Sequence, residues 1–349
     1  MELIIPCIPL WFELSALACC LGSLMFMLWV IPPAEATSSR DQGALRPRLW
    51  IFFSISLAVI LTCSSADLLS RTAEMSGEPL MSAFSSVPTV LFKTHAGLAW
   101  LVRAACLILI AVLIAAGRRH RDSRMFLFIL FLLCALIALT ESASGHASDK
   151  GDFTVSEMVD WLHLLGASFW AGGIFVLSLI ILPHAKRSGA SPPSDTASVV
   201  IRFSRIAGIA VLFVVLTALY NAWQYVGSIN AAVRTGYGLT VVAKAALLFL
   251  LLLLAAFTRY AMVPLFADRS GVNAEKSGLL TRLAGGVLAR FSPDKTGERV
   301  LDLFKRSVRL EAILMICLLF CASLLRHEIP ARHALHHSGS GTEMHRHMH

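Results

Sequence analysis

The chain has 349 residues, of which 56% are hydrophobic and only 15% are charged, with a mean hydropathy of +0.71. A soluble domain carries about a quarter charged residues, so this composition is typical of a membrane protein. The net charge of +8 does not indicate nucleic acid, because the basic residues gather in alternate loops between apolar runs.

Eight apolar runs are long enough, at roughly 20 residues, to cross a bilayer core. We expect each run to be a helix, since in lipid it must satisfy its own backbone hydrogen bonds. The first run is too long, and lacks the basic start, for a cleaved signal peptide. The predicted fold is therefore an all-α polytopic membrane protein. Its predicted spans are 10–31, 50–70, 93–116, 125–144, 157–182, 204–227, 238–260 and 308–325.

The distribution of positive charge predicts the orientation. Most of the 30 Lys and Arg residues fall in alternate loops, and two of them, Arg103 and Lys244, lie inside spans. The positive-inside rule places the basic loops in the cytoplasm and both termini outside. In a bacterium this predicts a multi-pass protein of the inner membrane with both termini in the periplasm.

The two halves of the chain resemble each other. The segment THAGLAWLVR from Thr94 aligns with TGYGLTVVAK from Thr235, and WFELSALACCLG from Trp11 aligns with WLHLLGASFWAG from Trp161. Four spans separate each segment from its match, an even number, so both copies have the same orientation. The sequence thus predicts two parallel four-helix repeats.

This repeat divides the chain into three predicted parts. Residues 1–145 form the N-terminal repeat, residues 146–326 form the C-terminal repeat, and residues 327–349 form a periplasmic tail. Within the second repeat, residues 261–307 are a cytoplasmic segment. Its apolar residues between Leu279 and Phe291 predict an amphipathic helix on the inner membrane surface.

The eight cysteines all fall in or beside spans, without a CxxC pair. Their predicted role is that of small apolar packing residues. No disulfide framework is indicated.

Charged residues inside spans cost several kcal/mol, so each needs an explanation. Two interpretations stand side by side: buried ion pairs that fix the helix register, or a polar cavity that opens outward. Both use basic and acidic groups at comparable depth from the outer surface. These are Arg103, Lys244, Glu13, Asp67, Glu141 and, less deep, Asp160.

Three histidines, His95, His146 and His163, fall on the predicted outer side and suggest metal ligands. Asp160 precedes His163 by three residues and is expected to orient its ring, as metal-bound histidines usually require. Glu157 lies beside this pair, and Met158 is a candidate thioether ligand.

The tail is rich in histidine and methionine, which indicates a metal-binding tract, with a purification tag as the alternative. Imidazole together with thioether favours copper, particularly Cu(I). The tail histidines are His327, His333, His336, His337, His345, His347 and His349.

Four ordered segments resemble the copper resistance protein D (CopD) family: GHA from Gly145, VDWLHLLGASFWAGG from Val159, RFSRIAGIAVLFVVLTALYNAW from Arg202 and TGYGLTVVAKAALLFLLLLLAAFTR from Thr235. The resemblance covers the second half closely and extends to the first through GLAWLVR. It implies an inner-membrane protein that binds copper and moves it across the membrane. A separate periplasmic partner of the CopC type is also implied.

The resemblance further implies that His146 and His163 are copper ligands. His95 departs from the family pattern, so its predicted role depends on its depth alone. We therefore expect a copper transporter rather than an enzyme, with copper ion and the lipid bilayer as partners, and uptake as the predicted direction. One alternative is a b-type haem electron carrier with His95 and His163 as axial ligands. Another is a metal-sensing or chaperone-docking protein without transport.

Overall fold

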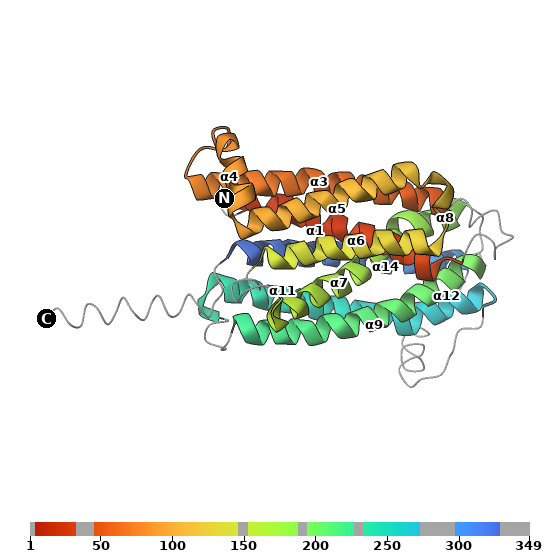
Figure 1. Cartoon of the computed structure of the whole chain (residues 1–349). Coiled ribbons are helices and arrows are strands. Elements are labelled where there is room, and N and C mark those ends of the chain that lie inside the picture. The colour runs from red at the N-terminus through yellow and green to blue at the C-terminus, as the bar shows by residue number, and fades with distance from the viewer. Residues whose placement is uncertain are drawn as a thin grey trace.

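The computed structural model describes residues 4–32, 45–145, 153–187, 194–226, 233–272 and 297–328. These residues form helices joined by short turns, without a strand. Eight of the helices are long and apolar enough to cross a membrane, as predicted, so the chain is a multi-pass membrane protein. They lie roughly alongside one another in an elongated bundle (Figure 1).

The helices and the short elements between them run in this order: α1 (Ile4–Met25), η1 (Phe26–Val30), α3 (Leu45–Ser76), η3 (Ala83–Ser86), α4 (Val87–Lys93), α5 (His95–Ala116), η4 (Arg118–His120), α6 (Arg124–Ala143), α7 (Val155–Val176), η6 (Leu177–Ile181), α8 (Leu182–Arg187), α9 (Ser194–Tyr225), α11 (Gly236–Phe257), η7 (Thr258–Met262), α12 (Val263–Arg269) and α14 (Gly297–His327). The segments η1, η6 and η7 are single turns of π-helix that continue the helix before them. Six of the eight spans are longer than predicted, because helical backbone continues into the polar residues at the ends of the apolar runs, whereas His95–Ala116 and Arg124–Ala143 are not.

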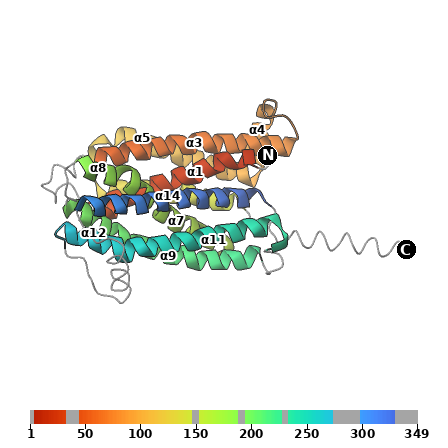
Figure 2. The same ribbon diagram turned by 180° about the vertical axis from the view of Figure 1, so that it is seen from behind.

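The two ends of the bundle differ in charge. The start of α1 and the end of α14 lie at the same end of the bundle in Figures 1 and 2. We call this end the terminal end. The opposite, basic end carries α8 and α12. The described arginines near the basic end include Arg46, Arg48, Arg118, Arg119, Arg121, Arg124, Arg202, Arg205, Arg306 and Arg309.

Three spans in each half of the chain have matching lengths. Helices α1 and α7 have 22 residues each and both continue into a five-residue π segment. Helices α3 and α9 have 32 residues, and α5 and α11 have 22. The helices α5 and α11 also begin with the same cap, in which Thr94 and Thr235 accept a hydrogen bond from the amide of Gly97 and Gly238 at 3.0 Å. The two-repeat arrangement stays a prediction, which these paired features favour.

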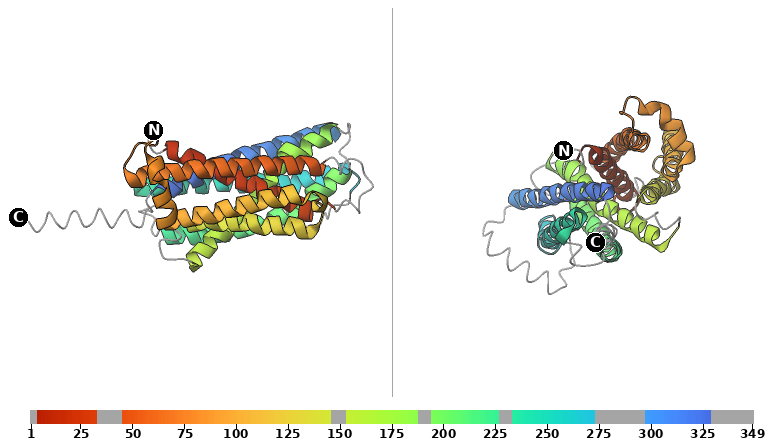
Figure 3. Two further views of the ribbon diagram at one scale, coloured as in Figure 1. Left: turned by 45° about the horizontal axis from the view of Figure 1, so that its top comes forward. Right: turned by 90° about the vertical axis from the view of Figure 1, so that its left-hand side faces the viewer.

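Helix α1 of the first half packs with α7 and α14 of the second half in the middle of the bundle. The remaining long helices flank this contact, with α3, α5 and α6 on one side and α9 and α11 on the other (Figure 3). The backbones of α1 and α7 approach each other at Gly22 and Gly172. A Cβ added to Gly172 would lie 1.8 Å from the carbonyl oxygen of Ala18. Small residues permit such close approaches between membrane helices, and here they join the two halves.

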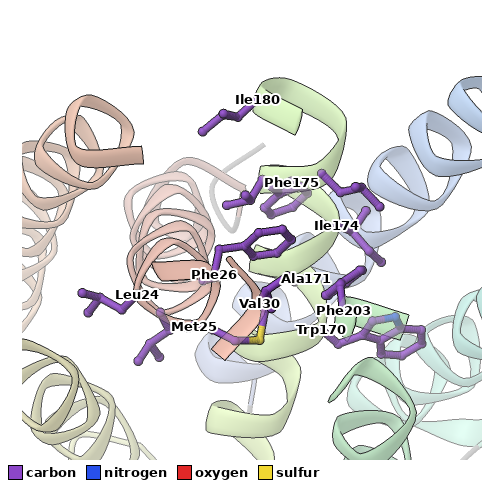
Figure 4. Packing of buried hydrophobic residues seen from close by; sticks show 14 of the residues in the cluster. Leu24, Met25, Phe26, Val30, Trp170, Ala171, Ile174, Phe175, Ile180 and Phe203 are labelled. Atoms are coloured by element: carbon purple, nitrogen blue, oxygen red, sulfur yellow. The ribbon is translucent and has the colours of Figure 1, made fainter. Parts of the chain in front are cut away.

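The apolar core gathers towards the basic half of this contact. Phe26 and Val30 from η1 pack with Trp170, Phe175 and other residues of α7 in Figure 4. The ring of Phe203 from α9 lies 5.5 Å from that of Phe26, measured between ring centres.

The predicted amphipathic helix between Leu279 and Phe291 lies outside the described residues. At its two sides, residues 263–269 form α12, and residues from 297 onward belong to α14. The segment 261–307, which was predicted to be cytoplasmic, is thus partly an extension of the two flanking spans.

Candidate functional site

A buried cluster of charges lies in the N-terminal half, where α1, α5 and α6 meet. A guanidinium nitrogen of Arg103 lies 2.7 Å from Glu13 Oε1 and 2.5 Å from Glu141 Oε1. The three side chains are only 4%, 1% and 2% exposed. We call these three residues the charge cluster. They were predicted at comparable depth, and the structure brings them into contact.

Neutral hydroxyl groups complete the surroundings of Arg103. Its Nε donates to Thr140 Oγ1 at 3.0 Å, and its Nη1 donates to Ser64 Oγ at 3.2 Å. A buried charge is tolerated where it is paired and its remaining hydrogen-bonding groups are satisfied. Three helices, α1, α3 and α6, thus supply the partners of the single guanidinium group on α5.

Further charges border the cluster towards the terminal end. Arg326 of α14 lies 3.5 Å from Glu141 Oε2, and Arg71 pairs with Asp67 at 2.7 Å on α3. These residues line a small cavity of about 20 Å³, which has room for about one water molecule. Glu13 Oε2 is buried without a hydrogen-bond partner among the described residues. The ion pairs of the cluster thus border a small polar cavity, whereas a cavity that opens to the outer side stays a prediction.

A second polar site lies in the C-terminal half around His163 of α7. Its Nδ1 is 2.9 Å from Thr217 Oγ1 of α9. The Thr217 hydroxyl is 2.6 Å from the carbonyl oxygen of Phe213, to which it donates its only proton. The proton between the two side chains therefore belongs to His163 Nδ1, and Nε2 carries the lone pair. This is the tautomer in which a histidine binds a metal through Nε2.

Asp160 was expected to orient the ring of His163, and Thr217 makes that hydrogen bond instead. The carboxylate of Asp160 accepts from Ser142 Oγ at 2.9 Å and from Asn221 Nδ2 at 3.3 Å. Lys244 of α11, which is half-buried, lies close enough to act electrostatically on both Asp160 and His163. The site thus joins α6, α7, α9 and α11.

Other predicted site residues have local surroundings that the structure describes. Glu157 caps the start of α7: its carboxylate accepts from the amide of Phe153 at 2.5 Å, while Thr154 Oγ1 accepts from the Glu157 amide at 3.3 Å. Such a capping box stabilises a helix N-terminus. Met158 is half-buried, and His95 is exposed at the first residue of α5.

The predicted ligands do not form a compact cluster in the part of the chain that the structure describes. Among these residues, no three His, Cys, Asp or Glu side chains are close enough to hold a metal ion together. His146 and the tail histidines His333, His336, His337, His345, His347 and His349 lie outside the described residues. His327 is described: its Nδ1 is 3.0 Å from the carbonyl oxygen of Ser323 and 3.5 Å from Cys7 Sγ.

Several polar residues at these sites were not predicted from the sequence. Thr217 and Asn221 hold His163 and Asp160, and Arg326, assigned to the outside, reaches the buried Glu141. Glu311 was not predicted either: it is 5% exposed, is hydrogen-bonded to Thr258, and lies beside a cavity of about 400 Å³ near the basic end. Its position could have been noticed in the sequence, because Glu311 is the single acidic residue inside the last predicted apolar run, 308–325.

Comparisons with known proteins agree with the resemblance. A family model described as "Copper resistance protein D-like, N-terminal domain" matches residues 8–155, and one described as "Copper resistance protein D" matches residues 197–325. Copper transport protein CutJ of Bacillus subtilis (strain 168) is 28% identical over 249 residues, which cover 69% of this chain and 44% of CutJ. Copper resistance protein D of Pseudomonas syringae pv. tomato is 27% identical over 249 residues, 70% of this chain and 78% of that protein. The matched region is thus less than half of CutJ. No solved structure matches the chain.

Proposed function

Because the chain belongs to the copper resistance protein D family, we propose that it carries copper across the bacterial inner membrane. The similar proteins are named for copper transport and copper resistance rather than for a reaction. The proposed cargo is copper ion, and the proposed role is copper homeostasis without chemistry on another substrate.

The observation that carries this proposal is the environment of His163. Its ring lies inside a membrane-spanning helix, where an apolar residue would be less costly. Thr217 fixes the ring at Nδ1 and leaves Nε2 for a ligand, and imidazole nitrogen is a good ligand for copper. We assign His163 as the copper ligand of the membrane-spanning part, with His146, His95 and Met158 as further candidates.

The proposed direction is uptake. The concentration of described arginines at the basic end supports a cytoplasmic location for that end, which puts the terminal end in the periplasm. The tail from His327 to His349 then lies on the side from which copper enters. On this proposal the tail captures copper directly or from a separate CopC-type protein.

Copper accumulation in copper-limited cells tests this proposal. Cells that express the wild type are compared with cells that carry the empty vector, His163→Ala, or a chain truncated after Ile329. His163→Ala is expected to remove most of the accumulated copper, and truncation to reduce it only at low external copper. The matched control is His120→Ala, an exposed histidine at the basic end, which is expected to behave as wild type.

If the wild type accumulates no more copper than the empty vector, transport is refuted. Copper binding by the purified protein would then favour the sensing or docking alternative.

The haem alternative gains no support from the described residues. Its two axial ligands would be His95 and His163. His95 is exposed at the first residue of α5, whereas His163 lies inside α7 with its ring bonded to α9.

A further inference from the structure

One carboxylate is buried in the last span without an ion-pair partner. Glu311 of α14 is 5% exposed and lies just inside the predicted apolar run 308–325. Among the described residues it forms no salt bridge, whereas Glu13 and Glu141 of the charge cluster share Arg103. An ionisable side chain inside a membrane span is costly, and it marks a functional site by default. The burial of Glu311 therefore needs an explanation other than an ion pair.

The polar neighbours of Glu311 are two hydroxyl groups. Thr258, the first residue of η7, hydrogen-bonds to Glu311 Oε1, and its Oγ1 lies 2.6 Å from Ser307 Oγ of α14. All three side chains are buried. Hydroxyls elsewhere in the spans, such as those of Ser54 and Thr62, donate to the carbonyl four residues back on their own helix. Those of Thr258 and Ser307 instead meet across the contact between two neighbouring segments.

This row of hydroxyls suits Glu311 in both protonation states. When the carboxylate is ionised, Ser307 donates to Thr258, and Thr258 donates to Glu311. When Glu311 is protonated, its O–H donates to Thr258, which donates to Ser307. Each hydroxyl has one proton and also accepts, so rotation of the O–H bonds reverses the direction. The hydrogen bonds between the three side chains thus persist when Glu311 takes up or loses a proton.

The cavity of about 400 Å³ near the basic end gives water access to this carboxylate. Glu311 and Thr258 line it, together with Arg205 and Arg259. The volume has room for on the order of ten water molecules, and these side chains supply polar partners for them. Because Arg205 is exposed, the lining extends to the surface of the bundle.

The charged groups around the cavity have other contacts. The guanidinium group of Arg259 donates to the carbonyl oxygen of Ser204 and lies 5.8 Å from the centre of the Tyr260 ring. The lining residues from α7, η6, α11 and α12 include no charged or titratable side chain, and none comes from α1. Lys305, buried on α14, does not line the cavity. A proton is then the simplest means of neutralising Glu311.

We propose that Glu311 is a proton-binding site, and that the protein couples copper movement to the binding and release of a proton at this carboxylate. The coupling rests on the proposed function, whereas the proton site does not depend on the cargo. In each cycle a carboxylate oxygen of Glu311 takes one proton from water in the cavity and later returns it to water. The π-helical turn that begins at Thr258 fits this role, since such turns are frequent at functional sites.

Infrared difference spectroscopy of the purified full-length protein tests the proton site. Spectra are recorded over a series of pH values in the C=O stretching region of protonated carboxylic acids. The wild type is expected to show a titrating band that is lost in Glu311→Gln. Glutamine has nearly the same volume and still accepts a hydrogen bond from Thr258. Elution as a single species on size exclusion identifies the folded variants.

Two further variants make this assignment specific. Asp302→Asn is the matched control, because Asp302 is an exposed carboxylate on the same helix, and it is expected to keep the band of Glu311. Thr258→Val removes the hydrogen bond to Glu311 and is expected to shift the band to higher frequency. A merely structural role of Thr258 would leave the frequency unchanged.

Copper entry into liposomes that contain the purified protein tests the coupling. Cu(I), kept reduced with ascorbate, is added outside at constant external pH, and the internal pH is either equal to the external pH or lower. The copper retained in the liposomes is measured over time. The wild type is expected to differ in its rate of copper entry between the two conditions, and this difference is expected to be lost in Glu311→Gln.

A band that persists in folded Glu311→Gln, or a wild-type rate of copper entry that does not depend on internal pH, would overturn the proposal. If the wild type carries no copper at all, the proposed function and the coupling are refuted together. The infrared titration still decides by itself whether Glu311 binds a proton, so the two failures can be told apart.

Discussion

Replacing Arg103 by methionine tests whether the charge cluster is a paired, water-poor arrangement. Arg103 lies between Glu13 and Glu141 at 2.7 and 2.5 Å, and neither carboxylate is more than 2% exposed. Methionine fills most of the same volume without a charge. The substitution therefore removes the partner that two buried carboxylates share.

The expected cost follows from this burial. Removing one member of a buried ion pair typically costs about 3–5 kcal/mol, because the other charge is left without compensation. Glu141 keeps a second cation, Arg326, at 3.5 Å, whereas Glu13 Oε2 has no partner among the described residues even in the intact cluster. We therefore expect Arg103→Met to lower the free energy of unfolding by about 4 kcal/mol, mainly through Glu13.

Reversible unfolding in mixed detergent micelles measures this loss. The control is Arg118→Met, an exposed arginine at the basic end, whose substitution is expected to change stability by less than about 0.5 kcal/mol. The double variant Glu13→Gln with Arg103→Met leaves Glu141 with Arg326 and balances the charges. It is expected to recover about half of the loss.

A loss below about 1 kcal/mol for Arg103→Met would refute the reasoning, since this is the range of solvent-exposed ion pairs. The same holds if the double variant is less stable than the single one.

Three further substitutions test other parts of the structure. Gly172→Ala is expected to prevent a stable bundle, because the added Cβ would overlap the backbone of α1. Gly236→Ala is the control: the nearest atom to its added Cβ is 4.0 Å away, so this variant should express as wild type. Expression level and size exclusion compare the two variants. Thr217→Val removes the hydrogen bond to His163 Nδ1 and is expected to weaken copper binding by that histidine about 10–100-fold, measured by metal titration. An unchanged affinity would show that the ring needs no such support. Thr154→Ala removes the N-cap of α7 and is expected to lower the free energy of unfolding by about 1 kcal/mol without changing copper accumulation. A folded Thr154→Ala variant that accumulates less copper would contradict a purely structural role of Thr154.

The spans and the members of the charge cluster could be predicted because lipid makes strong demands on sequence. A charge inside an apolar run is conspicuous, so Glu13, Arg103 and Glu141 were recognised and grouped by depth. The partners of His163 and Asp160 were not, because threonine and asparagine are common in membrane helices and only the packing of α9 against α7 selects them. The π segments likewise depend on how each helix packs, which the length of an apolar run does not specify.

The charge cluster also constrains how the chain enters the membrane. Glu13 belongs to the first span, whereas Arg103 belongs to the third and Glu141 to the fourth, so synthesis delivers the carboxylate long before its partner. Until then α1 carries an uncompensated acidic group that opposes its residence in lipid. Stable integration of α1 thus waits for α5, and the first spans are expected to leave the insertion machinery as a group. A nascent chain stopped before Thr94 should accordingly be easier to extract from membranes with alkali than one that continues beyond Ala116.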